Sequence, residues 1–298
     1  MSLRRSPPPR RSPITQDRRN SLTAVLGPAF IEQERDLTPG GLTKPGYVGD
    51  IRDVGPGRVV AIIPAHNEAS RIAEALESLA AQTRIADGVL VIADRCSDQT
   101  RPLAIAHNAT ARITIDNRDK KAGALDQVLA YLLPRLSDND AVLIMDADTS
   151  LSPVFISEAT RRLREPDGDG ARVGGVGGIF LGYPLKGFLA HIQNNEYVRY
   201  AREIGRRKGR ADVLTGTATL FSVRALRDVL RARSTGRLPR GTGVYDVEAL
   251  TEDNELTLAL QASGVPLCLA EGVHRRHRAY ADDTAPVSAT FALATRRA

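Results

Sequence analysis

Four short runs of aliphatic and β-branched residues, each followed by a helical or turn pattern, constrain the fold of this chain most. The runs are VVAII at 59–63, VLVIA at 89–93, ARITI at 111–115 and AVLIM at 141–145. Runs that are apolar throughout suit strands covered on both faces. Ile72, Leu76 and Leu79 recur at helical spacing after the first run, and 122–136 repeats that spacing. This alternation predicts an α/β layer fold with a mostly parallel central sheet and helices on both faces.

The remaining chain divides into three parts. Residues 1–50 are rich in Arg, Pro and Ser, and we expect a disordered basic arm there, either solvated or touching nucleic acid or an anionic membrane. We expect one domain over 56–269, with a Gly-rich strand at 173–183, a polar helix at about 186–208 and a strand within 213–222. Residues 270–298 lack periodicity and are expected to form an irregular tail.

Composition narrows the possible locations of the protein. The 298 residues contain two cysteines, with neither a disulfide framework nor metal-ligand spacing, which suits a reducing cytosol. The basic N-terminal arm is not followed by the apolar segment of a signal peptide. No apolar run of about 18 residues occurs in the printed chain, so no transmembrane helix is expected within it.

The run at 141–145 ends in two carboxylates, Asp146 and Asp148. Ligands of α/β sheets bind at the carboxyl ends of the strands, which is where these side chains project. Hard divalent cations such as Mg²⁺ and Mn²⁺ prefer oxygen ligands of this kind. The alternative is helix capping, with Asp148 or Ser150 at the start of a helix near Pro153. The tripeptide alone leaves both interpretations open.

Other polar groups follow the first strands at the same predicted edge. Residues 64–70, PAHNEAS, close the first run and open a helix whose amides suit an anion, although capping by Asn67 explains them equally well. Asp94 ends the second run, where nucleotide folds place a ribose-binding acid; a simple turn is the alternative. Lys120 and Lys121 begin a helix, where the helix dipole disfavours cations, so a nearby phosphate or simple solvation must account for them.

The segment 249–256, ALTEDNEL, places acids at the start of a predicted helix. Thr251 is a candidate N-cap, and acids in the first turn favour the helix dipole. If Asp253 points into a cleft, it can instead take a proton from a hydroxyl nucleophile.

Taken together, the strings IIPAHNE, VIADRCSDQT, KKAGALD, MDADTS, TGTATLF and ALTEDNEL resemble family 2 inverting glycosyltransferases of the GT-A fold. The resemblance runs from about residue 58 to 268. It is closest to the membrane-associated branch of poly-N-acetylglucosamine, hyaluronan and cellulose synthases, which also carry a stretch similar to QNNEY at 193–197. It implies a Rossmann-like GT-A fold, transfer of a sugar with inversion, and Mg²⁺ or Mn²⁺ as cofactor.

The resemblance also implies roles for single residues on the donor side. Asp146 and Asp148 match the Asp-x-Asp of the family, with Asp146 toward the nucleotide-sugar and Asp148 as the metal ligand. Lys121 matches a lysine that approaches the donor diphosphate. The nucleotide pocket is implied to be lined by Ala65, His66, Glu68 and, at the uridine, Asp94.

On the acceptor side, Asp253 matches the aspartate of the Thr-Glu-Asp motif, which acts as the general base. Thr215, Gly216, Thr217 and Glu252 match the motifs that flank the acceptor.

One motif of the processive relatives, Gln-x-x-Arg-Trp after the Thr-Glu-Asp helix, is missing, and the chain has no Trp. Shifting the reading frame of 270–298 by one base, with permitted synonymous codons, gives PKECTVGTELMPT and QRLRWQRGA, which resemble the family at this distance. We therefore expect the tail to be an out-of-frame reading of a longer enzyme, with membrane segments lost downstream.

The sequence predicts a glycosyltransferase that moves a sugar, most simply from a UDP-sugar, to a glycan, lipid or protein hydroxyl. No specific nucleic-acid partner is expected, and the location is cytoplasmic or at the cytoplasmic face of a membrane. Two alternatives remain: a catalytically impaired nucleotide-binding remnant, and a sugar-phosphate nucleotidyltransferase. The second needs a Gly-rich triphosphate loop with Arg and Lys, which 64–70 does not provide.

Overall fold

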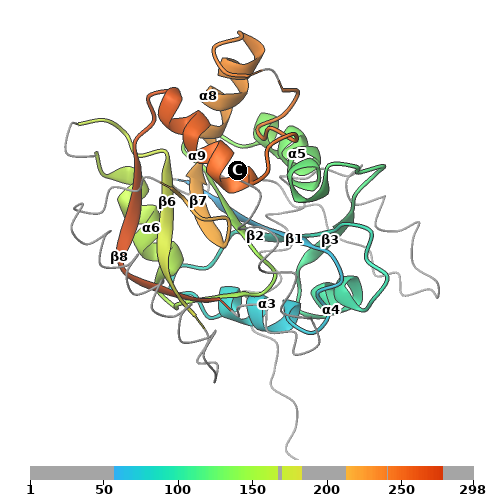
Figure 1. Ribbon diagram of the computed structural model, residues 1–298. Helices are drawn as coiled ribbons and strands as arrows, with labels where there is room; N and C mark the ends of the chain where they lie inside the picture. The colour runs from blue at the N-terminus through green and yellow to red at the C-terminus, as the bar shows by residue number, and fades with distance from the viewer. Residues whose placement is uncertain (1–56, 167–169, 183–212, 240, 278–298) are drawn as a thin grey trace, which may run out of the picture.

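The computed structural model describes residues 57–166, 170–182, 213–239 and 241–277 (Figure 1). Within these ranges the strands are β1 (Val59–Ala65), β2 (Gly88–Ala93), β3 (Thr110–Ile113), β4 (Ala141–Met145), β5 (Thr149–Leu151), β6 (Gly175–Gly182), β7 (Ala218–Ser222) and β8 (Leu267–His277). The helices are α3 (Ile72–Ala80), α4 (Thr100–Ala106), α5 (Lys120–Leu132), the 3-10 turn η1 (Leu133–Arg135), α6 (Phe155–Arg164), α8 (Val223–Ser234) and α9 (Glu252–Ala262). None of the helices in these ranges is long and apolar enough to cross a membrane.

The strands form a single sheet in the order β3-β2-β1-β4-β7-β6-β8-β5. The first four are parallel, with Ile62 of β1 between Leu90 of β2 and Ile144 of β4. β7 runs antiparallel to both β4 and β6, and β8 is parallel to β6. The carboxyl ends of β1, β2 and β4 therefore meet at one edge, which is where such sheets bind ligands.

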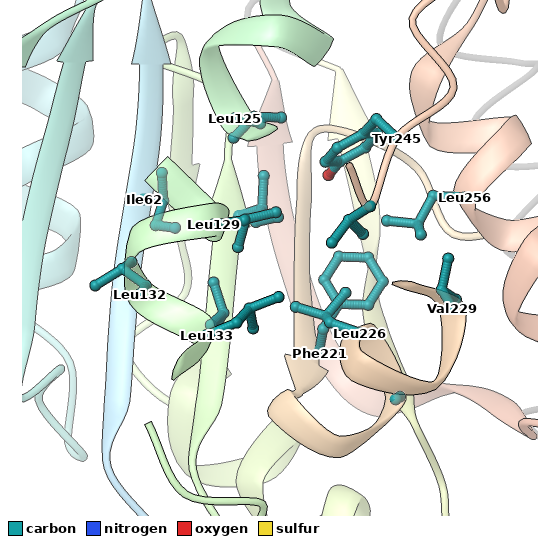
Figure 2. Close-up of a cluster of buried hydrophobic side chains, with 14 of the residues drawn as sticks. Ile62, Leu125, Leu129, Leu132, Leu133, Phe221, Leu226, Val229, Tyr245 and Leu256 are labelled. Carbon is teal, nitrogen blue, oxygen red and sulfur yellow. The ribbon is translucent and has the colours of Figure 1, made fainter. Parts of the chain in front are cut away.

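Helices cover both faces of the sheet, because alternate residues of each central strand point to opposite sides. Val60 and Ile62 of β1 belong to the core beneath α5, α8 and α9, part of which is drawn in Figure 2. Val59, Ala61 and Ile63 belong to the second core, beneath α3, α4 and α6. These residues are at most 1% exposed, and fully burying one Val or Ile contributes about 1.5–3 kcal/mol. The predicted α/β fold, with a mostly parallel central sheet and helices on both faces, is confirmed.

The predicted helix faces are also confirmed. Ile72, Leu76 and Leu79 are the buried face of α3, and α5 buries Leu125, Val128, Leu129 and Leu132. The Gly-rich run at 173–183 forms β6, and the run at 213–222 forms β7 only from Ala218 onward. The helix expected at 186–208 and the basic arm at 1–50 lie outside the described residues.

Two segments differ from the expectations. The capping interpretation of Asp148 and Ser150 is wrong, because 149–151 pair with β8 as β5 and α6 begins only after Val154. The strand β8 continues to His277, beyond the domain boundary expected at residue 269, and pairs there with β5 and β6. The rest of the expected tail, 278–298, lies outside the described residues.

Candidate active site

The predicted site residues gather at the carboxyl edge of the parallel strands. Met145 ends β4, and the Asp146 amide then donates to the Thr217 carbonyl (2.9 Å), which ties this strand end to the loop before β7. The Thr149 amide donates back to the Asp146 carbonyl (3.2 Å) and closes a turn. Ala147 is buried in this turn, while the Asp146 and Asp148 side chains remain 26% and 16% exposed. Both carboxylates therefore remain partly accessible to solvent at the carboxyl end of β4.

Lys121 links the Asp-x-Asp turn to the Thr-Glu-Asp helix. Its Nζ lies 2.7 Å from Asp146 Oδ1 and 2.8 Å from Glu252 Oε1. Burial lowers the pKa of Lys121, but the two carboxylates outweigh burial and raise the pKa above its usual range. Burial raises the pKa of Glu252, and the neighbouring Lys121 reverses this and lowers it. Two carboxylates thus compensate for a cation at the start of α5, where the helix dipole disfavours it.

Asp253 lies next to Lys121, in the first turn of α9. Its Oδ2 accepts a hydrogen bond from the Gly216 amide (2.9 Å), and its Oδ1 accepts one from the Asn254 amide (3.0 Å). A Cβ at Gly216 would lie 3.0 Å from Lys121 Nζ and 3.3 Å from Asp253 Cβ, so glycine permits this close approach. Thr215 and Thr217 flank the glycine, with their hydroxyls 3.0 Å apart. The carboxylate is therefore held by backbone amides and oriented beside a cation.

Thr251 occupies the N-cap position of α9, as predicted, but its side chain makes no capping hydrogen bond there. The acids of the first turn also have specific partners: Lys121 for Glu252 and the Gly216 amide for Asp253. Favourable interaction with the helix dipole therefore does not account for this segment by itself.

The nucleotide side of the site is built from the ends of β1 and β2. The Asp94 amide donates to the Ala65 carbonyl (2.9 Å), and His66 Nδ1 lies 2.7 Å from the Asp94 carbonyl oxygen. That oxygen can only accept, so His66 Nδ1 is the donor of this hydrogen bond. The Asp94 side chain is 7% exposed, with Oδ1 accepting from the Thr114 hydroxyl (2.6 Å). Within the described part of the chain its Oδ2 accepts no hydrogen bond, which leaves one carboxylate oxygen for a ligand.

The loops that carry this side of the site adopt unusual backbone conformations. Asn67 and Arg95 follow β1 and β2 with φ angles of 57° and 48°, in the left-handed region that non-glycine residues rarely occupy. Asn67 does not cap α3: its Oδ1 accepts from the Ser97 amide (2.8 Å) and so joins the two loops. Strained backbone of this kind clusters at ligand sites, where the surrounding structure fixes it.

Arg71 was missed by the sequence analysis and lies between two predicted site residues. Its Nη1 is 3.9 Å from Glu68 Oε2 and 3.8 Å from Asp148 Oδ2. Burial is the main reason that the pKa of Glu68 is raised, and Asp148 and Asp146 raise it further, against the lowering effect of Arg71. The spacing from Glu68 to Arg71 across the start of a helix was the only sequence signal, and it is common in helices.

The same edge therefore has an excess of negative charge in the described part of the chain. Glu68, Asp146, Asp148, Glu252 and Asp253 lie around two cations, Lys121 and Arg71. Among the described residues no three metal-binding side chains form a complete metal centre. Mg²⁺ is typically held by one or two carboxylates together with substrate phosphates. Asp146 and Asp148 fit such a shared site in number and chemistry, and a cation there would offset the repulsion between these carboxylates and Glu68.

A buried tyrosine, which no sequence motif marks, lies close to Asp253. Tyr245 is 3% exposed and lines a small cavity with Lys121, Gly216, Glu252 and Asp253. Burial, followed by the nearby carboxylates, raises its pKa well above the usual value, so the phenol stays protonated.

Solved structures similar to this chain include a mannosyltransferase and the protein TarS. The mannosyltransferase PcManGT from Pyrobaculum calidifontis, in complex with GDP-Man and Mn²⁺, superposes with a TM-score of 0.55 at 19% identity, over 90% of this chain and 68% of that one. S. aureus TarS 1-349 in complex with UDP-GlcNAc gives a TM-score of 0.51 at 15% identity, over 77% of this chain and 62% of that one. The chain thus spans about three-fifths of the length of that TarS structure.

At these identities the structural likeness shows the fold alone, and no curated protein matches the chain. The family is shown by sequence, since the model of glycosyltransferase like family 2 matches residues 56–297. The geometry of the carboxyl edge, with its Asp-x-Asp turn facing the Thr-Glu-Asp helix, agrees with that match. The chain belongs to the glycosyltransferase like family 2.

Proposed function

We propose that this protein transfers a sugar from a UDP-sugar to an acceptor hydroxyl with inversion at the anomeric carbon, assisted by Mg²⁺ or Mn²⁺. The observation that carries the proposal is the contact of Lys121 with both Asp146 and Glu252, at 2.7 and 2.8 Å, directly beside Asp253. This contact joins the donor and acceptor motifs in one site. Two structural neighbours are complexes with GDP-Man and with UDP-GlcNAc, which supports a nucleotide-sugar donor.

Separate residues bind the nucleotide, the diphosphate and the metal. Ala65, His66 and Asp94 line the nucleotide pocket, where the open Asp94 Oδ2 accepts a hydrogen bond from the base. Lys121 is positioned to approach the diphosphate. Asp148, together with Asp146, would hold the metal, which when bound supplies Lewis-acid neutralisation of the departing diphosphate.

Asp253 removes the proton from the acceptor hydroxyl, whose oxygen then attacks the anomeric carbon on the face opposite to the diphosphate. The Gly216 and Asn254 amides hold both oxygens of this carboxylate in a fixed orientation. General-base catalysis typically contributes 10²–10⁴-fold, and holding two substrates in line contributes about 7–11 kcal/mol.

We place the enzyme in the cytoplasm or at the cytoplasmic face of a membrane, in the polysaccharide-synthase branch of the family. Both cysteines are free, and Cys268 is buried, as suits a reducing compartment. The branch rests on the order of the motifs in the sequence.

Calorimetric titration of UDP tests the donor site. We expect UDP to bind in the presence of Mn²⁺ and to bind at least tenfold more weakly with chelator or in Asp148→Asn. Asp138→Asn is the matched control, because Asp138 is an exposed acid paired with Arg227 before β4, at the opposite end of that strand. Equal UDP affinity with and without Mn²⁺ in the wild type, or equal Mn²⁺-dependent affinity in Asp148→Asn and Asp138→Asn, would contradict the metal assignment. Absence of UDP binding by the folded wild type would contradict the donor assignment itself.

A further inference from the structure

A buried arginine on α8 connects three parts of the chain behind the active site. Arg233 is 1% exposed, and its Nη2 lies 2.6 and 2.7 Å from the two carboxylate oxygens of Glu255 on α9. Its Nε donates to the Val244 carbonyl (3.2 Å) and its Nη1 to the Pro239 carbonyl (3.3 Å). One guanidinium therefore joins α8, the first turn of α9, and the segment between them, residues 241–251, which we name the clamp loop.

Asp126 holds the clamp loop from the opposite side. Its Oδ1 accepts from the Val244 amide (2.8 Å) and the Tyr245 amide (3.2 Å). A Cβ at Gly243 would lie 1.9 Å from Asp126 Oδ2, so only glycine permits this approach. Asp126 belongs to α5, the helix whose first turn carries Lys121. The clamp loop is thus fixed to the helix of Lys121 and to the helix of Asp253.

These contacts lie directly behind the proposed catalytic group. The clamp loop ends at Thr251, immediately before Glu252 and Asp253, and it places Tyr245 in the cavity shared with these acids and Lys121. Glu255, the partner of Arg233, follows Asp253 by two residues on the same helix, and its Oε2 also accepts from the Asp246 amide (3.1 Å). A shift of the loop would therefore move the first turn of α9 relative to α5.

We propose that Arg233 and Asp126 are positioning residues that clamp the 241–251 loop and so set Glu252 and Asp253 against Lys121. The inference rests on the proposed transferase function, because it assigns to these contacts an effect on the transfer step. A buried ion pair contributes little net stability against its cost of desolvation. The planar guanidinium, by contrast, donates from Nη2, Nε and Nη1 to Glu255, Val244 and Pro239 at the same time, and this fixes orientation, which an aliphatic side chain of similar size cannot do.

The matched control for Arg233 is Arg227, on the same helix. Arg227 also binds backbone carbonyls, those of Leu133 and Leu136 (both 2.6 Å), and pairs with Asp138, but it does not touch the clamp loop. Arg227→Met therefore removes comparable contacts from α8 without releasing the loop.

The experiment measures Mn²⁺-dependent UDP affinity by calorimetry, and UDP release from UDP-GlcNAc with water as the acceptor. For Arg233→Met we expect a UDP Kd within about threefold of the wild type and a release rate lowered by about tenfold to a hundredfold, as displaced catalytic groups produce. Arg233→Lys restores the charge without the planar fork, so it should recover thermal stability but remain slow. Arg227→Met should lower the melting temperature and leave the rate unchanged.

Equal rate losses in Arg233→Met and Arg227→Met, at equal losses of melting temperature, would overturn the positioning role. If Arg233→Met does not fold, Asp126→Asn tests the clamp from the other side with the same readouts. Amide hydrogen exchange gives a test that is independent of activity: exchange over 241–256 should accelerate in Arg233→Met and not in Arg227→Met, and an unchanged pattern refutes the clamp. A wild type that exchanges as expected but neither binds UDP nor releases it would instead refute the proposed function.

Discussion

Removal of the Lys121 ammonium by Lys121→Met should destabilise the fold as well as weaken the donor site. Breaking a fully buried ion pair costs about 3–5 kcal/mol, whereas exposed pairs contribute about 0–1 kcal/mol. Lys121, Asp146 and Glu252 are 25–28% exposed, between these limits. We therefore expect a loss of about 1–2 kcal/mol at pH 7, which corresponds to a fall in Tm of ~2–8 °C for a domain of this size.

The stabilising contribution of these ion pairs should depend on pH. The pKa of Lys121 is raised, so its stabilising contribution is complete at pH 7, below its ordinary value of 10.5. The pKa of Glu252 is lowered, so its contribution is complete above its ordinary value of 4.5 and is lost as the pH falls below that value. The difference in Tm between wild type and Lys121→Met should thus be largest at pH 7 and shrink below about pH 4.5.

Thermal unfolding followed by circular dichroism from pH 7 to pH 3.5 measures this difference. The neighbouring Lys120→Met is the control, because Lys120 is exposed and is in no ion pair among the described residues. The reasoning is refuted if both variants have the same Tm at pH 7, or if the loss in Lys121→Met does not depend on pH.

Three further predictions follow from the same contacts. Gly216→Ala should lower UDP release from UDP-GlcNAc by about tenfold or more while the Tm changes little, because its Cβ displaces the flexible Lys121 ammonium by steric contact at 3.0 Å. Gly243→Ala should lower the free energy of unfolding by at least ~2 kcal/mol, measured in urea, since its Cβ overlaps Asp126; Gly241→Ala, with its nearest contact at 3.4 Å, should change it much less. Burial raises the pKa of Asp126 to about 6, so the wild type should lose stability relative to Asp126→Asn as the pH rises from 4 to 7, and parallel pH profiles would contradict that shift.

The parallel half of the fold could be predicted from the sequence, because the strands of this half are continuous apolar runs and its helices each have one apolar face. Residues 59–63 and 141–145 lie within β1 and β4, and the buried face of α3 follows the spacing of Ile72, Leu76 and Leu79. The edge at which Asp146 and Asp148 meet the other motifs followed from the rule for ligands of parallel sheets.

The contacts between distant segments could not be predicted in this way. The Arg71 contact with Asp148 joins helix α3 to the turn after β4, and the Arg233 contact with Glu255 joins α8 to α9. Neither pair has a local signal, because each depends on how separate elements pack. The alternative that Asp148 or Ser150 caps a helix rested on the local preference of Asp and Ser for caps, but the pairing of 149–151 with β8 outweighs that preference.

The most direct test of the account is the rate of UDP release from UDP-GlcNAc by wild type and Asp253→Asn, with UDP affinity measured on the same samples. Asparagine retains an oxygen that can accept from the Gly216 amide but cannot take a proton, so binding should be preserved while release falls by about 10²–10⁴-fold. A variant that binds UDP and releases it at the wild-type rate would contradict the assignment of Asp253 as the base.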